Sequence, residues 1–341
     1  MKHVKNSLYV LTQETTLRKE SDSVVVIAGS TPKTKIPLIA LDAIFCFGRV
    51  RCTQQLLACC AAKGIAVNFL SRTGRFLASV QGFNRGNVAL RREQFRKADD
   101  PAACLAIART IVEGKIANYR TNLRRAARER TPETSTPIHN AANRLDSILQ
   151  SVATYQSIDV LRGIEGDATR IYFSTFNAMI THPDPALQFT RRSRRPPLDP
   201  INALLSFGYT LLAADMRSAC EAAGLDARVG YLHQLRSGRA SLALDLMEDF
   251  RSLIVDRLVL SLVNRRQVSA LDFCRTNCDG MQMTEPLRRV FISAYQRKKQ
   301  TSIIHPVTNE SVTFGECMIM QARSLAKYLS GGESYQSFLG R

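Results

Sequence analysis

Three side chains that could do chemistry lie close together in the segment 230–251, namely His233, Asp245 and Glu248. The second half of this segment has apolar residues at helical spacing, which predicts a strong helix. Asp245 and Asp249 point away from the main apolar stripe of that helix, and Glu248 lies on its flank. Other faces are apolar too, so the helix is expected to be buried, where a carboxylate is costly unless it is paired or bound to a metal ion. This cost makes Asp245 and Glu248 candidates for chemistry.

A further candidate carboxylate, Glu165, lies between Gly163 and Gly166, ahead of an aromatic-rich apolar segment. The glycines leave the backbone around the carboxylate open to a substrate phosphate. The same glutamate is equally well explained as an N-terminal helix residue that stabilises the helix dipole. His233 has a similar alternative, because a lone histidine is more often a structural residue than a ligand. The residue types alone leave these alternatives open.

Several common catalytic patterns are absent from the sequence. It has no GxSxG nucleophile elbow and neither a P-loop nor a Rossmann glycine pattern. Its nine cysteines include the adjacent pair Cys59 and Cys60, and most of the others have apolar neighbours, as is typical of reduced thiols. The start of the sequence lacks an apolar leader, and no apolar run approaches the ~20 residues of a membrane span. We therefore expect a cytoplasmic protein.

The charge of the chain points to an anionic partner. Its 47 Lys and Arg residues outnumber 29 Asp and Glu residues, which gives a formal net charge of +18 over 341 residues. Residues 1–85 and the remainder are both basic, so the excess is not confined to a detachable tail. A broad positive surface of this kind favours a nucleic acid.

The elements that position these residues fall into two parts. Residues 1–85 read as short strands, punctuated by glycine and proline turns. The expected strands are 8–11, 23–28, 35–39, 43–47, 65–70 and 75–80, and one helix is expected at 53–63.

After residue 86 the hydrophobic period becomes helical. Two polar loops, 131–140 and 181–200, are expected to interrupt the helices, and a single helix is expected from about 240 to 266. The predicted fold class is therefore α+β, with a small β-rich N-terminal domain at 1–85 and a larger all-α catalytic domain at 86–341.

Four ordered motifs resemble the CRISPR-associated protein one family, the spacer-acquisition integrases and endonucleases. The motifs are GIAVNFLSRTGRFLASVQG in the β-rich part, EGDATRIYF around Glu165, DPINALLSFGYTLL, and HQLRSGRASLALDLMEDFR from His233. The resemblance covers essentially the whole chain, and the motif wording is most similar to the subtype C branch of type I systems.

The resemblance implies a metal site and a reaction. Glu165, His233 and Glu248 are expected to be both the catalytic residues and the ligands of Mn²⁺ or Mg²⁺, with Asp245 and Asn202 supporting them. Two carboxylates and one imidazole suit such an ion and leave places for water and phosphate. The family reaction is attack by a 3′-hydroxyl on a phosphodiester, which requires no nucleotide hydrolysis. Asp249, next to Glu248, is the alternative second acid.

The basic residues gain a role in the same interpretation. Arg191, Arg192, Arg194 and Arg195 form a cluster in the proline-rich loop and are expected to contact DNA. Arg120 and Arg124, with Lys115 and Arg128, fall mostly on one side of a helix and could follow a phosphate backbone, although a solvated face explains them equally well. Tyr172 could stack on a base, although burial is the commoner fate of such a residue.

The family also implies partners. We expect double-stranded DNA (prespacer and CRISPR repeat) as substrate, a homodimer formed mainly through residues 1–85, and a small second adaptation protein that completes a heterohexamer. Two alternatives are a non-catalytic nucleic-acid-binding scaffold and a metal-dependent nuclease that cleaves branched DNA in repair.

Overall fold

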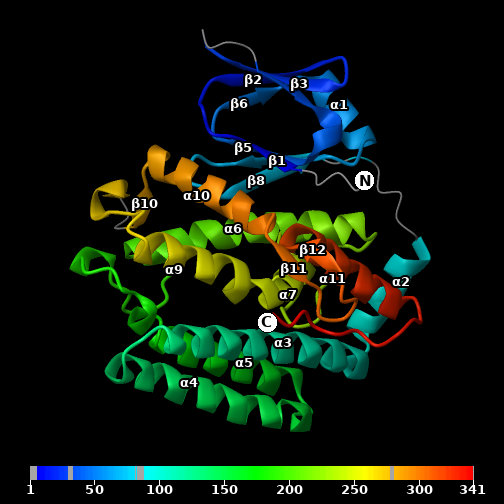
Figure 1. Ribbon diagram of the computed structural model, residues 1–341. Coiled ribbons are helices and arrows are strands. Elements are labelled where there is room, and N and C mark those ends of the chain that lie inside the picture. Colours follow the sequence, from blue (N-terminus) through cyan, green and yellow to red (C-terminus); the bar gives the residue numbers. More distant parts are fainter. Residues whose placement is uncertain (1–5, 30–33, 81, 83–87, 277–279, 341) are drawn as a thin grey trace. The chain divides into compact units, whose positions relative to one another are not determined.

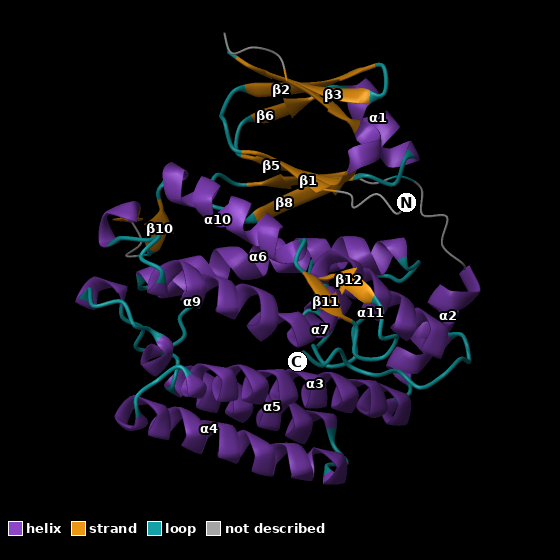
Figure 2. Ribbon diagram, in the orientation of Figure 1, coloured by secondary structure: helices purple, strands orange, loops and turns teal. Residues whose placement is uncertain are grey.

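The chain divides into two compact units in a computed structural model (Figure 1). The structure describes residues 6–29, 34–80, 82, 88–276 and 280–340. Unit 1 consists of residues 1–85 and 285–300, and unit 2 of residues 86–284 and 301–341. The expected α+β class is confirmed, with a strand-rich N-terminal region followed by a helical region (Figure 2).

Unit 1 contains two four-stranded sheets. One has the order β1-β5-β7-β8, in which the first three strands are parallel and β8 is antiparallel to β7. The other has the order β4-β3-β2-β6, in which β6 is parallel to β2. The strands are β1 Asn6–Val10, β2 Thr15–Glu20, β3 Ser23–Ala28, β4 Thr34–Pro37, β5 Leu41–Phe47, β6 Val50–Cys52, β7 Ala66–Leu70 and β8 Phe76–Val80.

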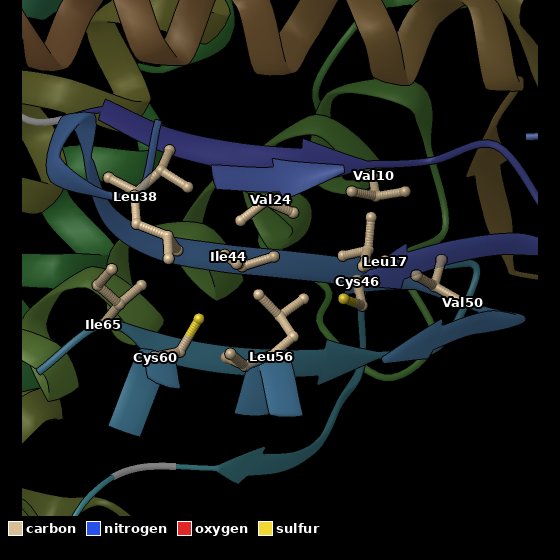
Figure 3. Close-up of a cluster of buried hydrophobic side chains, with 12 residues drawn as sticks. Val10, Leu17, Val24, Leu38, Ile44, Cys46, Val50, Leu56, Cys60 and Ile65 are labelled. Atoms are coloured by element: carbon tan, nitrogen blue, oxygen red, sulfur yellow. The ribbon is translucent and has the colours of Figure 1, made fainter. Parts of the chain in front are cut away.

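The core of unit 1 lies between these sheets and helix α1, Gln54–Ala62 (Figure 3). Leu17 and Val24 from one sheet meet Ile44 from the other, and all three are fully buried. Leu56 and Cys60 add one face of α1, whose first turn is capped by the Thr53 side chain. The expected helix at 53–63 and most of the expected strands are therefore present.

Three elements of unit 1 were not predicted as such. β2 has the sequence TTLRKE, which is too polar to suggest a strand, yet it lies in the interior of its sheet between β3 and β6. Its Leu17 supplies the buried contact that the composition conceals. The three-residue β6 was not expected either. Helix α10, Glu285–Lys299, belongs to unit 1 through tertiary contacts, which no local pattern reveals.

Unit 2 is built mainly from helices. They are α2 Val88–Asp99, α3 Pro101–Arg128, α4 Pro132–Ser151, α5 Ile158–Ser174, α6 Pro200–Ala222, α7 Ser241–Leu246, α8 Glu248–Phe250, α9 Arg257–Asn264 and α11 Phe314–Leu329. Short 3-10 turns lie at Leu38–Ala40 in unit 1 and at Val152–Thr154, Asn177–Met179, Pro185–Leu187 and Ala270–Asp272 in unit 2. Two short antiparallel pairs, β9 Phe273–Arg275 with β10 Met281–Met283 and β11 Ser302–Ile304 with β12 Ser311–Thr313, accompany the helices.

Helices α3, α4 and α5 lie side by side (Figure 1). α3 begins at Pro101, where Asp100 caps the first turn, and its buried residues extend almost to its end. The expected loop at 131–140 is wrong, because α4 already begins at Pro132 and contains Pro137. Pro132 takes the favourable first position of the helix, and the fully buried Ile138 holds the next turns in place.

The single helix expected from about 240 to 266 is also wrong. The chain forms α7, turns at Met247, forms the short α8, and continues as a π-helical stretch Arg251–Asp256 before α9. Such π-helical turns interrupt the regular hydrogen-bond ladder and often occur at functional sites. The interruption falls directly beside Glu248.

Candidate metal centre

Two carboxylates share one lysine in unit 2. Glu165 lies on α5, Glu248 begins α8, and Lys115 comes from the middle of α3. The Lys115 ammonium group pairs with Glu165 Oε1 and lies 2.8 Å from Glu248 Oε2. The side chains of Lys115 and Glu248 are each 2% exposed, whereas that of Glu165 is 26% exposed. The cluster is therefore reached by solvent from the Glu165 side.

His233 lies in the irregular segment between α6 and α7, where Asp245 holds it. The Asp245 carboxylate accepts hydrogen bonds from the backbone amides of Tyr231, Leu232 and His233 at 2.6, 3.0 and 2.9 Å. Its Oδ1 also lies 2.6 Å from His233 Nδ1. Because a carboxylate only accepts, Nδ1 carries the ring proton, and Nε2 faces Glu248 Oε1 at 3.8 Å. Asp245 thus fixes both the loop and the orientation of the imidazole.

A guanidinium group completes the surroundings of Glu248. Arg251 Nη2 lies 3.0 Å from Glu248 Oε1, and its guanidinium carbon lies 5.0 Å from the centre of the Tyr209 ring. The guanidinium of Arg192 lies over the same ring at 5.4 Å. The Tyr209 hydroxyl donates to Asp256 Oδ1 at 2.5 Å, which fixes the ring that supports Arg251.

These contacts determine the charges in the cluster. Burial acts to raise the pKa of Glu248, but Arg251, Lys115 and His233 outweigh it and lower the pKa to about 2. Burial likewise opposes ionisation of Glu165, but Lys115 outweighs it and the pKa falls below its ordinary value. Burial acts to lower the pKa of Lys115, while Glu248 and Glu165 help to raise it above its ordinary value. Both carboxylates are therefore ionised near neutral pH.

Asp249, the alternative second acid, faces a different part of unit 2. Its Oδ2 accepts from the backbone amide of Phe338 at 3.0 Å and lies 3.3 Å from Gln321 Nε2. Burial raises the pKa of this carboxyl well above its ordinary value. Glu248, rather than Asp249, is therefore the acid that the structure brings to Glu165 and His233.

The residues present fit a divalent cation. Two carboxylates and an imidazole nitrogen form a donor set that suits Mn²⁺ or Mg²⁺. The Lys115 ammonium shows that positive charge is stabilised between the carboxylates, and Glu248 Oε2 is buried without a well-oriented hydrogen bond. Within the described part of the chain, no three His, Cys, Asp or Glu side chains already form a complete metal-binding cluster. A cation at this place therefore has to compete with Lys115.

Asn202 lies away from the carboxylates and organises the arginine-rich loop instead. Its Oδ1 accepts from Arg192 Nη1 at 2.6 Å and from the Ser193 amide at 2.9 Å, and its Nδ2 donates to the Arg191 carbonyl at 2.8 Å. Asn202 therefore reaches Glu248 only indirectly, through Arg192, Tyr209 and Arg251.

The expected DNA contacts separate into two groups in the structure. Arg191, Arg194 and Arg195 are exposed and remain available to a phosphate backbone. Arg192 is partly buried in the contacts with Asn202 and Tyr209, so its guanidinium has a structural role. Only the three exposed arginines, Arg191, Arg194 and Arg195, are therefore compatible with the predicted contact to DNA.

Three other predicted contacts have internal partners. Tyr172 is fully buried, stacks on Tyr119 with ring centres 3.9 Å apart, and its hydroxyl accepts from Asn122 at 2.6 Å. A base cannot reach it there, so its expected stacking role is wrong. Arg120 and Arg124 both pair with Asp146 on α4, the former at 2.7 Å, and thereby join α3 to α4.

Sequence reasoning missed Lys115 and Arg251 as members of the cluster. Lys115 was grouped with the surface arginines of its helix, although it is fully surrounded by protein. A signal was present, since it lies in the predominantly apolar middle of α3, where an unpaired ammonium group is too costly. The pattern did not indicate which acids would pair with it.

The fold and the cluster together define a two-unit, mixed α+β protein with a buried acidic centre and an exposed arginine loop. The model of the family described as "CRISPR associated protein Cas1" matches residues 8–297. A "CRISPR-associated endonuclease Cas1 1" from Chlorobaculum tepidum is 45% identical over 100% of both chains. The solved CAS1 protein TM1797 from Thermotoga maritima matches with a TM-score of 0.83 and 26% identity, covering 98% of this chain and 99% of that one.

A further similar chain occurs in a solved "Cas6-RT-Cas1--Cas2 complex", with a TM-score of 0.83 and 25% identity. The match covers 100% of this chain and 37% of that one. The chain belongs to the Cas1 family of CRISPR-associated proteins. The predicted endonuclease activity of a CRISPR-associated protein is thereby confirmed, and the protein is a nuclease rather than a non-catalytic scaffold.

Proposed function

We propose that Glu165, His233 and Glu248 bind one divalent metal ion, Mn²⁺ or Mg²⁺, and form the active site of this nuclease. The observation that supports this best is the convergence of both carboxylates on Lys115, with His233 Nε2 3.8 Å from Glu248 Oε1. When bound, the metal ion supplies Lewis acidity toward a phosphodiester.

The protein residues around the site have separable tasks. Asp245 holds the His233 ring so that its Nε2 atom faces Glu248. Arg251 and Lys115 keep Glu248 ionised and oriented. The exposed Arg191, Arg194 and Arg195 hold the phosphate backbone of the substrate DNA. In integration, a 3′-hydroxyl displaces one phosphodiester oxygen while a new phosphodiester forms.

A metal titration tests the site. Glu165→Gln is expected to abolish cleavage and strand transfer of labelled DNA at every Mn²⁺ concentration, while DNA affinity changes little. Asp167→Asn is the matched control, because Asp167 lies on the same helix but pairs only with Arg170 at the surface. Full activity of the Glu165→Gln variant would disprove the metal assignment.

The proposal extends to partners. We infer that the chain acts with a Cas2-type protein, because a similar chain occurs in a complex of that composition. Both four-stranded sheets of unit 1 have edge strands that a second copy can cover, which supports a homodimer through residues 1–85. Two such dimers around a central dimer of the second protein give the heterohexamer expected from the family resemblance. Light scattering of the purified chain, with and without that protein, measures both masses; a monomer of 38.0 kDa contradicts the dimer.

Two narrower expectations also stay proposals. Assignment to the subtype C branch of type I systems is tested by the neighbouring genes. A cytoplasmic location agrees with a DNA substrate and is tested by cell fractionation. Among the described residues, no helix is long and apolar enough to cross a membrane.

A further inference from the structure

The last described residues of the chain, 335–340, form a segment that we call the C-terminal strap. It contacts α3 and the short helix α8, which begins at Glu248. The Ser337 hydroxyl donates to the carbonyl of Thr110 on α3 at 2.5 Å. The Phe338 amide donates to Asp249 Oδ2 at 3.0 Å, and the Phe338 ring stacks on Phe250 with centres 5.0 Å apart.

Asn118 joins the strap to the candidate metal centre. It lies on α3 three positions after Lys115 and is 1% exposed. Its Nδ2 donates to the carbonyls of Asp249 and Phe338, both at 2.8 Å, and its Oδ1 accepts from the Gly340 amide at 2.8 Å. One amide side chain of α3 thus binds the residue after Glu248 and two residues of the strap, Phe338 and Gly340.

The Asp249 carbonyl accepts the Asn118 hydrogen bond at a break in the helix. It lies in the three-residue α8, directly before the π-helical stretch Arg251–Asp256. There the helical hydrogen-bond ladder changes period, and buried carbonyls are almost always hydrogen-bonded. Asn118 supplies the hydrogen bond from outside the helix, so the position of Glu248 depends on α3 and on the strap.

The packing around this junction leaves little space for movement. A Cβ atom on Gly114, the neighbour of Lys115, would lie 2.3 Å from Ser337 Cβ and 2.5 Å from Asp249 Oδ1. Gln321 Nε2 from α11 donates to the Tyr335 hydroxyl and the Gln336 carbonyl, both at 2.8 Å. The strap is therefore fixed to three helices, one of which carries Lys115.

We propose that the C-terminal strap is a brace for the active site and that Asn118 is a positioning residue for Glu248. Asn118 acts through the Asp249 carbonyl, which it holds at 2.8 Å, and this inference rests on the proposed metal-binding role of Glu248. Without the strap, Glu248 shifts relative to Lys115 and Glu165, and the site binds its metal ion more weakly.

The experiment compares the full-length wild type with Asn118→Ala and with Gln336→Ala. Mutation of a residue that orients metal ligands typically lowers metal affinity or activity about 10- to 100-fold. Asn118→Ala is therefore expected to raise the Mn²⁺ concentration for half-maximal cleavage by that factor. DNA affinity is expected to stay within about threefold, because phosphate contacts dominate it. Gln336→Ala is the control, since the Gln336 side chain is exposed and only its carbonyl is used.

A second variant ends at Ser334, and a synthetic peptide of residues 335–341 is added to it. Lower activity that the peptide restores supports the brace, whereas wild-type activity of the shortened chain overturns it. An Asn118→Ala variant whose activity falls only with its folded fraction, at an unchanged Mn²⁺ requirement, also overturns the positioning role. Glu165→Gln, assayed in parallel, separates the outcomes: if it is active, the metal site itself is wrong, and if it is inactive while Asn118→Ala behaves as wild type, only the brace fails.

Discussion

The ammonium group of Lys115 lies 2.8 Å from Glu248 Oε2, and both side chains are 2% exposed. The same ammonium pairs with Glu165 Oε1, so one buried cation joins the two carboxylates proposed to bind metal. Removing one partner of such a buried pair leaves an uncompensated charge, which is usually far more costly than the loss of a surface pair. Replacing Lys115 should therefore destabilise the protein.

Lys115→Met is expected to lower the free energy of unfolding by about 3–5 kcal/mol in the absence of metal, because two carboxylates lose their shared counter-ion. Urea denaturation followed by circular dichroism measures the change. Added Mn²⁺ is expected to stabilise the variant more than the wild type, since the cation no longer competes with the ammonium. Equal stabilisation of both proteins by Mn²⁺ contradicts competition at this place.

Glu248 and Asp249 are adjacent but are expected to behave differently. Glu248→Gln should abolish cleavage with DNA affinity retained, because a ligand and a charge are removed from the cluster. Asp249→Asn should keep activity within about threefold of wild type, because burial already raises the pKa of Asp249 well above its ordinary value and the amide preserves the shape. Asp249→Ala is expected to be worse than Asp249→Asn, since it removes the acceptor for the Phe338 amide. An inactive Asp249→Asn paired with an active Glu248→Gln reverses the ligand assignment.

The buried carboxyl group of Asp256 is expected to make the stability of the protein depend on pH. Burial is the main reason that its pKa is raised from 3.8 to about 6, with Tyr209 hydrogen bonding acting the other way. Because the folded pKa is above the unfolded one, the stability that Asp256 contributes is present below pH 3.8 and is lost as the pH rises toward 6. Asn does not titrate, so the Asp256→Asn variant does not lose this stability. Its free energy of unfolding relative to the wild type should therefore rise by about 3 kcal/mol between pH 3.8 and about 6. Urea unfolding across pH 4–7 tests this; a pH-independent difference between the two proteins contradicts the raised pKa.

The exposed arginines of the loop are expected to make DNA affinity depend on salt concentration. Alanine at Arg191, Arg194 and Arg195 together should weaken affinity for any DNA sequence. It should also reduce the slope of log affinity against log salt by about 0.9 for each DNA phosphate that an arginine no longer neutralises. Arg124→Ala is the control, because Arg124 is paired with Asp146 on α4. A triple variant with an unchanged slope shows that the loop does not touch the DNA backbone.

The acids and the histidine of the candidate site were named because their motifs resemble the family, since the residue types alone left their roles open. The structure places Glu165 and Glu248 beside one lysine and His233 beside Glu248. The strands of unit 1 followed from β-branched and apolar runs, and the start of α1 followed from the Thr53 cap. These strands and this helix start are determined by neighbours along the chain.

Tertiary structure alone decided which groups pair with the acids. Lys115 and Glu165 are 50 positions apart, and Asn118 and the Asp249 carbonyl are 131 apart. The apolar surroundings of Lys115 along α3 indicate that it is buried, but nothing local indicates which acids pair with it. Likewise, the broken helix around Glu248 has an apolar pattern that fits one continuous helix. At the interruption the Asp249 carbonyl accepts a hydrogen bond from Asn118 on α3, because a buried polar group must find its partner wherever the fold brings one within reach.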